Sequence, residues 1–218
     1  MTTPSDRSLL ALAAGVAAVV LWSAIAPHDR ATWWMEVAPV LLGVPLLFAT
    51  RRRFPLTALV YALLALHAVI LAVGGHYTYA RVPAFDWLRD ALDLGRNHYD
   101  RLGHFAQGFV PALLVREVLL RTSPLRRGGW LFFLVTCVAL AFSAFYELVE
   151  WWAAAAGGAA ADAFLGTQGD VWDSQWDMLL ALLGALAAQA LLGRLHDRQL
   201  AAAPGQEIQR MRSSVTTH

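Results

Sequence analysis

Six long apolar segments, separated by short polar stretches, dominate the hydropathy pattern of the chain. Each is close to the roughly 20 residues that a helix needs to cross a bilayer. The segments are Ser8–Ala26, Trp33–Thr50, Phe54–Val73, His98–Leu120, Trp130–Ala154 and Asp173–Leu195. The pattern predicts an all-α, polytopic membrane protein of about six transmembrane helices, with a single transmembrane domain over residues 1–200. The polar residues 201–218 are predicted to form a disordered tail.

The positions of the arginines predict how these helices are oriented. Arginines lie before the first segment, in the loops after the second and fourth segments, and after the sixth segment. The loop between the fifth and sixth segments has no basic residue. The positive-inside rule therefore predicts that both termini are cytoplasmic. The stretch FDWLRDALDLG lies in the outer loop between the third and fourth segments, and it is typical of a short amphipathic helix on the membrane surface.

The overall composition agrees with this class of protein. Hydrophobic residues make up 58% of the chain, charged residues make up 15%, and the net charge is +1. We therefore expect the lipid bilayer as the main partner and no nucleic acid, which would require a basic face. Cys137 lies in an apolar run and is predicted to be a buried, inert thiol. The oligomeric state is left open.

Three of the apolar segments carry acidic, histidine or amide side chains near their predicted outer ends. Ionisable residues inside spanning segments are costly and usually indicate function. At about 100° per residue, each set lies on one face of its helix. The fourth segment contributes Asp100, His104 and Gln107, the fifth contributes Ser143, Glu147 and Glu150 with Tyr146 beside them, and the sixth contributes Asp173 and Asp177. These faces are expected to meet at one depth in the outer leaflet.

Such a group of carboxylates needs a cation, and a divalent metal ion of unknown identity is one candidate. The expected metal ligands are Asp100, His104, Glu147, Asp173 and Asp177. This mixture of nitrogen and oxygen ligands suits zinc, manganese or iron. A metal with an open coordination position would activate water for hydrolysis or transfer.

The same group of residues predicts further roles if the protein is an enzyme. The carboxylates of Glu147, Glu150 and Asp177 are the candidates for catalysis, because a carboxylate that is not bound to metal can act as a general base. A lipid-linked or small amphipathic molecule is the expected substrate. The candidates for substrate contact are Arg101, Gln107, Tyr146 and Gln168.

Several alternatives stay open at this point. The polar faces could line a water-filled vestibule of a protein that binds or transports a cation or a lipid headgroup, or they could serve only helix packing. Glu147 could form a structural ion pair with Arg101 or Arg116, and Asp173 could act only as a helix cap. The sequence does not decide whether the site is catalytic. His28, His196 and His218 are predicted to be exposed loop or tail residues.

Four motifs carry a resemblance to a known family. They are GGHYTYARVP, RNHYDRLGHFAQGFVPALLVRE, AFSAFYELVEWW and FLGTQGDVWDSQWDMLLALLGAL. Over residues 35–195 they resemble the YjdF-type inner-membrane proteins of bacteria, which implies a multi-pass protein of the inner membrane but no particular activity. The order of the acidic and histidine residues also resembles VanZ-like membrane proteins, although Arg101 replaces a lysine and Asp177 replaces an amide of that pattern.

Overall fold

The computed structural model describes residues 4–157 and 168–202, which contain helices and loops and no strand. The helices are α1 (Asp6–Ser23), α2 (Arg30–Thr50), α3 (Ala58–Tyr77), α4 (Pro83–Ala91), α5 (Tyr99–Thr122), α6 (Gly129–Gly157) and α8 (Asp173–Ala201). All six predicted spanning segments are helices. The ends of five lie within four residues of the prediction, whereas α8 continues six residues past the predicted end at Leu195. Helix α4 is the predicted short helix. Most of the predicted tail lies outside the described residues.

Five of the described helices, namely α1, α2, α3, α6 and α8, are long and apolar enough to cross a membrane. Helix α5 has 24 residues but a lower hydrophobicity, because it carries several charged or polar side chains. Asp100, His104, Arg116 and Glu117 are all buried in the protein. A helix that turns its polar face inward can therefore cross the bilayer among its neighbours. The number of spans and the cytoplasmic termini stay predictions.

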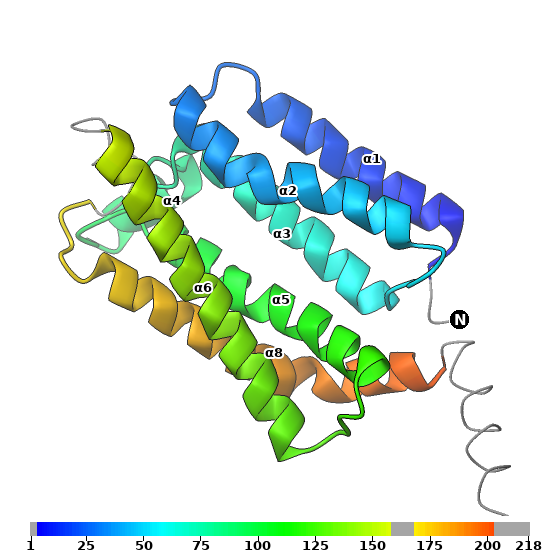
Figure 1. Ribbon diagram of the computed structural model, residues 1–218. Helices are drawn as coiled ribbons and strands as arrows, with labels where there is room; N and C mark the ends of the chain where they lie inside the picture. Colours follow the sequence, from blue (N-terminus) through cyan, green and yellow to red (C-terminus); the bar gives the residue numbers. More distant parts are fainter. Residues whose placement is uncertain (1–3, 158–167, 203–218) are drawn as a thin grey trace, which may run out of the picture.

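The long helices form two groups of three, which Figure 1 shows side by side. Helices α1 and α2 pack against α3, and α5, α6 and α8 pack against one another. The contact between α3 and α5 joins the two groups. Short connections make consecutive long helices antiparallel, so one end of the bundle holds the first turns of α2, α5 and α8 and the last turns of α3 and α6 (Figure 1). We call this the outer end, because the arginine pattern predicts that it faces outward.

The closest contact in the bundle is that between α5 and α8, and two glycines allow it. A side-chain carbon added at Gly184 would overlap the backbone carbonyl of Phe105, and one added at Gly108 would overlap that of Ala181. The two backbones can approach this closely only because neither glycine has a Cβ atom, as at small-residue contacts between other membrane helices. The contact fixes the height of Asp177 on α8 relative to His104 on α5.

Replacing Gly184 by alanine is expected to force α5 and α8 apart. The added methyl group would meet backbone atoms, which cannot move aside as a side chain can. Over-packing of this kind costs about 1–3 kcal/mol, so the unfolding temperature in mild detergent should fall. Gly193→Ala on the same helix is the matched control, because nothing lies within 4 Å of its added carbon. Equal unfolding temperatures for the two variants would contradict the proposed close contact.

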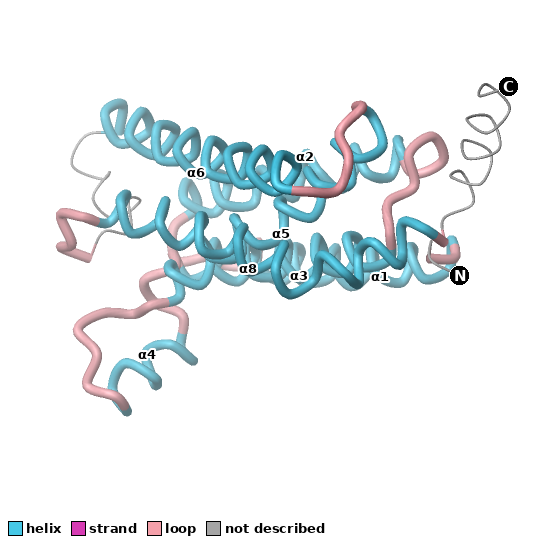
Figure 2. Tube along the Cα trace, turned by 90° about the horizontal axis from the view of Figure 1, so that it is seen from below, coloured by secondary structure: helices cyan, strands magenta, loops and turns pink. Residues whose placement is uncertain are grey.

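A polar junction holds α4 at the outer end, where it lies to one side of the long helices (Figure 2). Asn97 is fully buried, and its amide donates hydrogen bonds to the carbonyl of Val82 (3.1 Å) and to Asp86 (3.0 Å). The side chain of Trp87 on α4 is 72% exposed. The location of this helix on the membrane surface, where tryptophan is favoured, stays a prediction.

Candidate functional site

The polar residues at the outer end form two neighbouring groups, and the first is an arginine group made of Arg96, Arg101, Asp170 and Asp173. Arg96 Nη1 lies 2.5 Å from Asp173 Oδ1, and Arg101 Nη2 lies 2.8 Å from Asp170 Oδ2. Arg96 also reaches Asp100 at 3.5 Å. The backbone N–H of Trp172 donates a hydrogen bond to Asp170, and together with Arg101 it lowers the pKa of that carboxyl group below its ordinary value. These ion pairs tie the first turn of α8 to that of α5.

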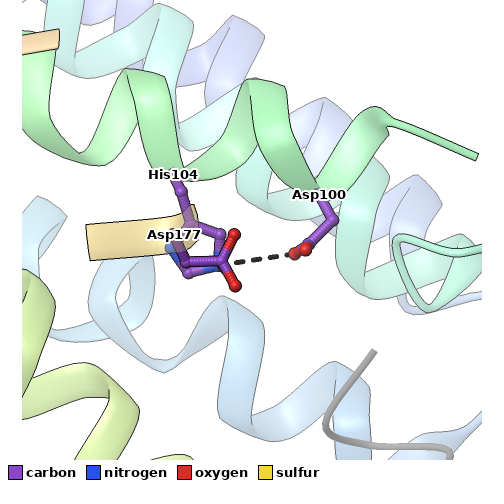
Figure 3. Close-up of side chains that lie close together, drawn as sticks. All are labelled: Asp100, His104 and Asp177. Atoms are coloured by element: carbon purple, nitrogen blue, oxygen red, sulfur yellow. Dashed lines mark ion pairs between the residues drawn. The ribbon is translucent and has the colours of Figure 1, made fainter. Parts of the chain in front are cut away.

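The second group surrounds His104, one turn deeper in the bundle, and we call it the histidine–carboxylate group. It consists of Glu36, Asp100, His104, Glu147, Glu150 and Asp177. Nε2 of His104 lies 3.4 Å from Asp100 Oδ1 and 3.8 Å from Asp177 Oδ2. Figure 3 shows the three side chains converging from α5 and α8. The prediction that α5, α6 and α8 bring their polar faces together is therefore consistent with the structure.

The two nitrogens of the His104 ring face different neighbours. Nδ1 lies 2.9 Å from Gln107 Oε1 and 3.9 Å from Glu147 Oε1, whereas Nε2 faces Asp100 and Asp177. A histidine that donates Nδ1–H to an amide oxygen keeps the lone pair on Nε2. In this tautomer the hydrogen bond to Gln107 would orient the ring for a metal ion on Nε2.

Two carboxylate oxygens in this group are buried without a hydrogen-bond partner among the described residues. They are Asp177 Oδ1 and Glu147 Oε1. Burying a charged oxygen is costly unless it is paired or bound to a metal. His104 is the basic side chain that lies within 4 Å of both carboxylates, and it cannot balance all the acids around it. The group therefore carries an excess of acidic side chains that favours a cation.

The spacing of the donor atoms fits a metal ion. One donor atom from each of Asp100, His104 and Asp177 lies within 4.8 Å of the others, and the same holds for His104, Glu147 and Glu150. Ligands about 2.0–2.4 Å from a common ion can be up to about 4–5 Å apart. The two sets share His104, so they describe two alternative positions for an ion.

A cavity of about 580 Å³ adjoins this group. Glu36, Asp100, His104, Gln107, Tyr146 and Glu150 line its outer part, and Leu114, Val115, Val118 and Leu119 line its inner part. Tyr146 donates a hydrogen bond of 3.2 Å to Glu36. Two of the predicted substrate contacts, Gln107 and Tyr146, thus face a space that is large enough for a ligand.

Other predicted site residues lie outside the histidine–carboxylate group. Arg101 and Asp173 belong to the arginine group, where they lie 3.7 Å apart. Gln168 lies at the rim and exchanges hydrogen bonds with the backbone N–H and carbonyl of Asn97, at 3.1 and 3.0 Å. The alternative ion pairs of Glu147 are not formed, because Arg101 pairs with Asp170 and Arg116 pairs with Asp197 at 2.7 Å.

The candidate residues predicted from the sequence did not include Glu36, although it is buried in the cavity wall. It lies in the second turn of α2, which runs inward from the outer end. The predicted orientation already places the start of this segment at the level of His104, so an acid inside it was the available signal. Arg96 was also missed, because it lies in a mixed loop where its charge looks like ordinary solvent exposure.

A third polar group lies at the opposite end of α5, which we call the inner end, and it corrects one prediction. His196 is fully buried, not exposed, because α8 continues to Ala201 and packs this turn against α5. Its Nε2 lies 3.1 Å from Glu117, and Arg116 lies 3.1 Å from its Nδ1. Cys137 corrects another prediction, since it is exposed on the outer surface of the bundle rather than buried.

Fold and site together define a class of protein, a polytopic all-α membrane protein with a buried histidine–carboxylate group near one end. The model of a family described as "Predicted membrane protein (DUF2238)" matches residues 8–198. The inner membrane protein YjdF of Escherichia coli (strain K12) is 57% identical over 182 residues, which cover 84% of this chain and 87% of YjdF. The chain therefore belongs to this family.

This membership confirms the resemblance to YjdF-type proteins and the expected location in the bacterial inner membrane. No solved structure matches the chain. The likeness to VanZ-like proteins stays a prediction.

Proposed function

We propose that the protein is a metal-dependent hydrolase or transferase that acts on an amphipathic substrate at the outer end of its helical bundle. The observation that carries this proposal is the pair of buried, unpartnered oxygens, Asp177 Oδ1 and Glu147 Oε1, on either side of His104. Packing alone does not account for two such oxygens. A cation bound beside His104 would satisfy an oxygen of this kind, and it would also provide the chemistry.

The metal position that the contacts favour is the one on the Nε2 side of His104. Asp100 and Asp177 supply carboxylate oxygens there, and Gln107 holds Nδ1 on the opposite side of the ring. Three protein ligands leave an open coordination position, as in catalytic zinc sites. The mixed nitrogen and oxygen set suits zinc, manganese or iron.

The remaining acids then have separate roles. A metal ion at this position would activate a water molecule, and Glu147 would accept the proton. The activated oxygen forms a bond to the phosphorus or acyl carbon of the substrate, the bond to the leaving oxygen breaks, and the proton passes to that oxygen. Glu150 faces the cavity and contacts the substrate. The inner wall made of Leu114, Val115, Val118 and Leu119 is apolar, which favours this reading over transport.

Metal analysis of the protein purified in mild detergent without chelator tests the proposal. We expect about one divalent ion per chain in the wild type and loss of that ion in His104→Ala and Asp177→Asn. Asp170→Asn is the matched control, because Asp170 is an acid at the same end of the bundle that pairs with Arg101 instead. A wild type free of metal after growth and purification in the presence of zinc, manganese and iron, or equal metal in all three variants, would overturn the metal site.

A further inference from the structure

The cavity has a long apolar part in addition to its polar outer part. Along α5 its wall extends from His104 to Leu119, which is roughly 22 Å at about 1.5 Å per residue. This length is about three quarters of the hydrocarbon thickness of a bilayer, roughly 30 Å. An elongated space of about 580 Å³ that is apolar over most of its length suits a single hydrocarbon chain.

The cavity also reaches the lipid-facing surface of the protein. Phe142 on α6 lines the cavity and is 58% exposed. The cavity is therefore open to the bilayer at this residue. Helix α2 packs on α3, whereas α6 packs on α5 and α8, and the hydrogen bond from Tyr146 to Glu36 connects the two sides at the outer end. A molecule dissolved in the membrane can therefore enter between α2 and α6.

The charged side chains in the outer part of the cavity determine which ligand headgroup fits there. Glu36 on α2 and Glu150 on α6 face the cavity and are 7% and 9% exposed. Glu150 has no hydrogen bond or ion pair with the part of the chain that the structure describes, so its carboxylate is aimed at the cavity without a partner. The nearby guanidinium groups of Arg96 and Arg101 pair with Asp100, Asp170 and Asp173 instead.

A metal ion on the Nε2 side of His104 would balance Asp100 and Asp177, and it would leave Glu36 and Glu150 facing the ligand. An anionic headgroup would meet these two carboxylates at close range. A protonated amine would pair with both, and the rings of Tyr79 and Tyr146 in the same wall would add cation–π attraction.

We propose that the cavity binds an amphiphile with one long hydrocarbon chain and a protonated amine headgroup. The chain lies along α5 toward Leu119, and the amine lies between Glu36 and Glu150. This inference names the headgroup charge and the single chain of the amphipathic substrate, in which an acyl bond between chain and headgroup would be the reacting group, and it rests on the proposed function only for the chemistry that follows binding. Binding itself needs the cavity and the two acids, and it does not need the metal.

Photo-crosslinking of the full-length protein in lipid nanodiscs tests the inference. Three probes carry the same long alkyl chain with a diazirine near its methyl end, and they differ only in an ammonium, hydroxyl or carboxylate headgroup. We expect the ammonium probe to label the α5 stretch from Leu114 to Leu119 about tenfold more than the hydroxyl probe, and the carboxylate probe to label it least. Mass spectrometry of peptides locates the label.

Variants test the polar part and the apolar part of the cavity separately. Glu36→Gln combined with Glu150→Gln should reduce labelling by the ammonium probe to the level of the hydroxyl probe. Val115→Trp should abolish labelling by filling the chain-binding part. Leu66→Trp is the matched control, because Leu66 is 54% exposed on α3 and does not line the cavity.

The outcomes separate this inference from the metal site. Equal labelling by the three probes on the wild-type protein, or labelling that Val115→Trp leaves unchanged, would overturn the inference, and the first comparison needs no variant to fold. Labelling that persists in chelator supports an amine site that is independent of metal. Preferential labelling by the carboxylate probe would indicate an anionic ligand and would reject the amine.

Discussion

Replacing Glu117 by alanine is expected to lower the free energy of unfolding by about 3–5 kcal/mol, the usual cost of removing one partner from a buried charge pair. The carboxylate of Glu117 is fully buried, and it accepts hydrogen bonds from the backbone and hydroxyl of Thr57, from Arg121 and from His196. Alanine would leave all of these donors without their acceptor at the junction of α3, α5 and α8. Unfolding by SDS in mixed micelles measures the change.

Two further variants make the Glu117 result specific. Glu117→Gln keeps the shape and can still accept hydrogen bonds from Thr57, so we expect a smaller loss than with alanine. Arg127→Gln removes a side chain that is 48% exposed and pairs with Asp197, and it should change stability by less than about 1 kcal/mol. If Glu117→Ala were as mild as Arg127→Gln, the buried network would not be a main support of the inner end.

The helices could be predicted from the sequence because bilayer thickness and helix rise fix the length of an apolar segment. The burial of individual polar residues could not be predicted in this way. His196 follows an apolar run and sits among charged residues, a pattern typical of an exposed helix end. It is buried because α8 continues past the predicted end and packs against Arg116 and Glu117 on α5. That pairing depends on tertiary packing, which hydropathy does not record.

For the candidate site, too, local helical spacing could be predicted from the sequence, whereas the contacts made by tertiary packing could not. Helical spacing on α5 placed Asp100, His104 and Gln107 on one face, and the contacts of His104 agree with it. The sequence could not show that Asp173 and Asp177 belong to different groups, since both are acids one turn apart on α8. Only the fold shows that the first meets Arg96 and the second meets His104.

The cavity could not be predicted either, because it depends on the angle between two three-helix groups. The position of Glu36 inside an apolar segment indicates its depth, but only the packing of α2 on α3 places it in the cavity wall. The opposite-facing walls of the cavity thus come from segments that are more than 100 residues apart, as the hydrogen bond between Tyr146 and Glu36 illustrates.

The second large effect is a change of sign at Asp177. In chelator-treated protein, Asp177→Asn is expected to raise the free energy of unfolding by about 1–2 kcal/mol, because it removes a buried acid that has one unpartnered oxygen and acidic neighbours. In metal-saturated protein the same change removes a ligand. Saturation at about 100 times the dissociation constant stabilises the wild type by about 2.7 kcal/mol, and the variant should lose most of this gain.

Unfolding temperatures of the wild type, Asp177→Asn and Asp170→Asn, each with metal and with chelator, separate a metal ligand from a packing residue. A ligand predicts that the order of wild type and Asp177→Asn reverses between the two conditions. A residue that serves only helix packing would shift the temperature in the same direction and by the same amount in both. Asp170→Asn should respond to metal as the wild type does, because Asp170 is held by Arg101 and lies outside the histidine–carboxylate group.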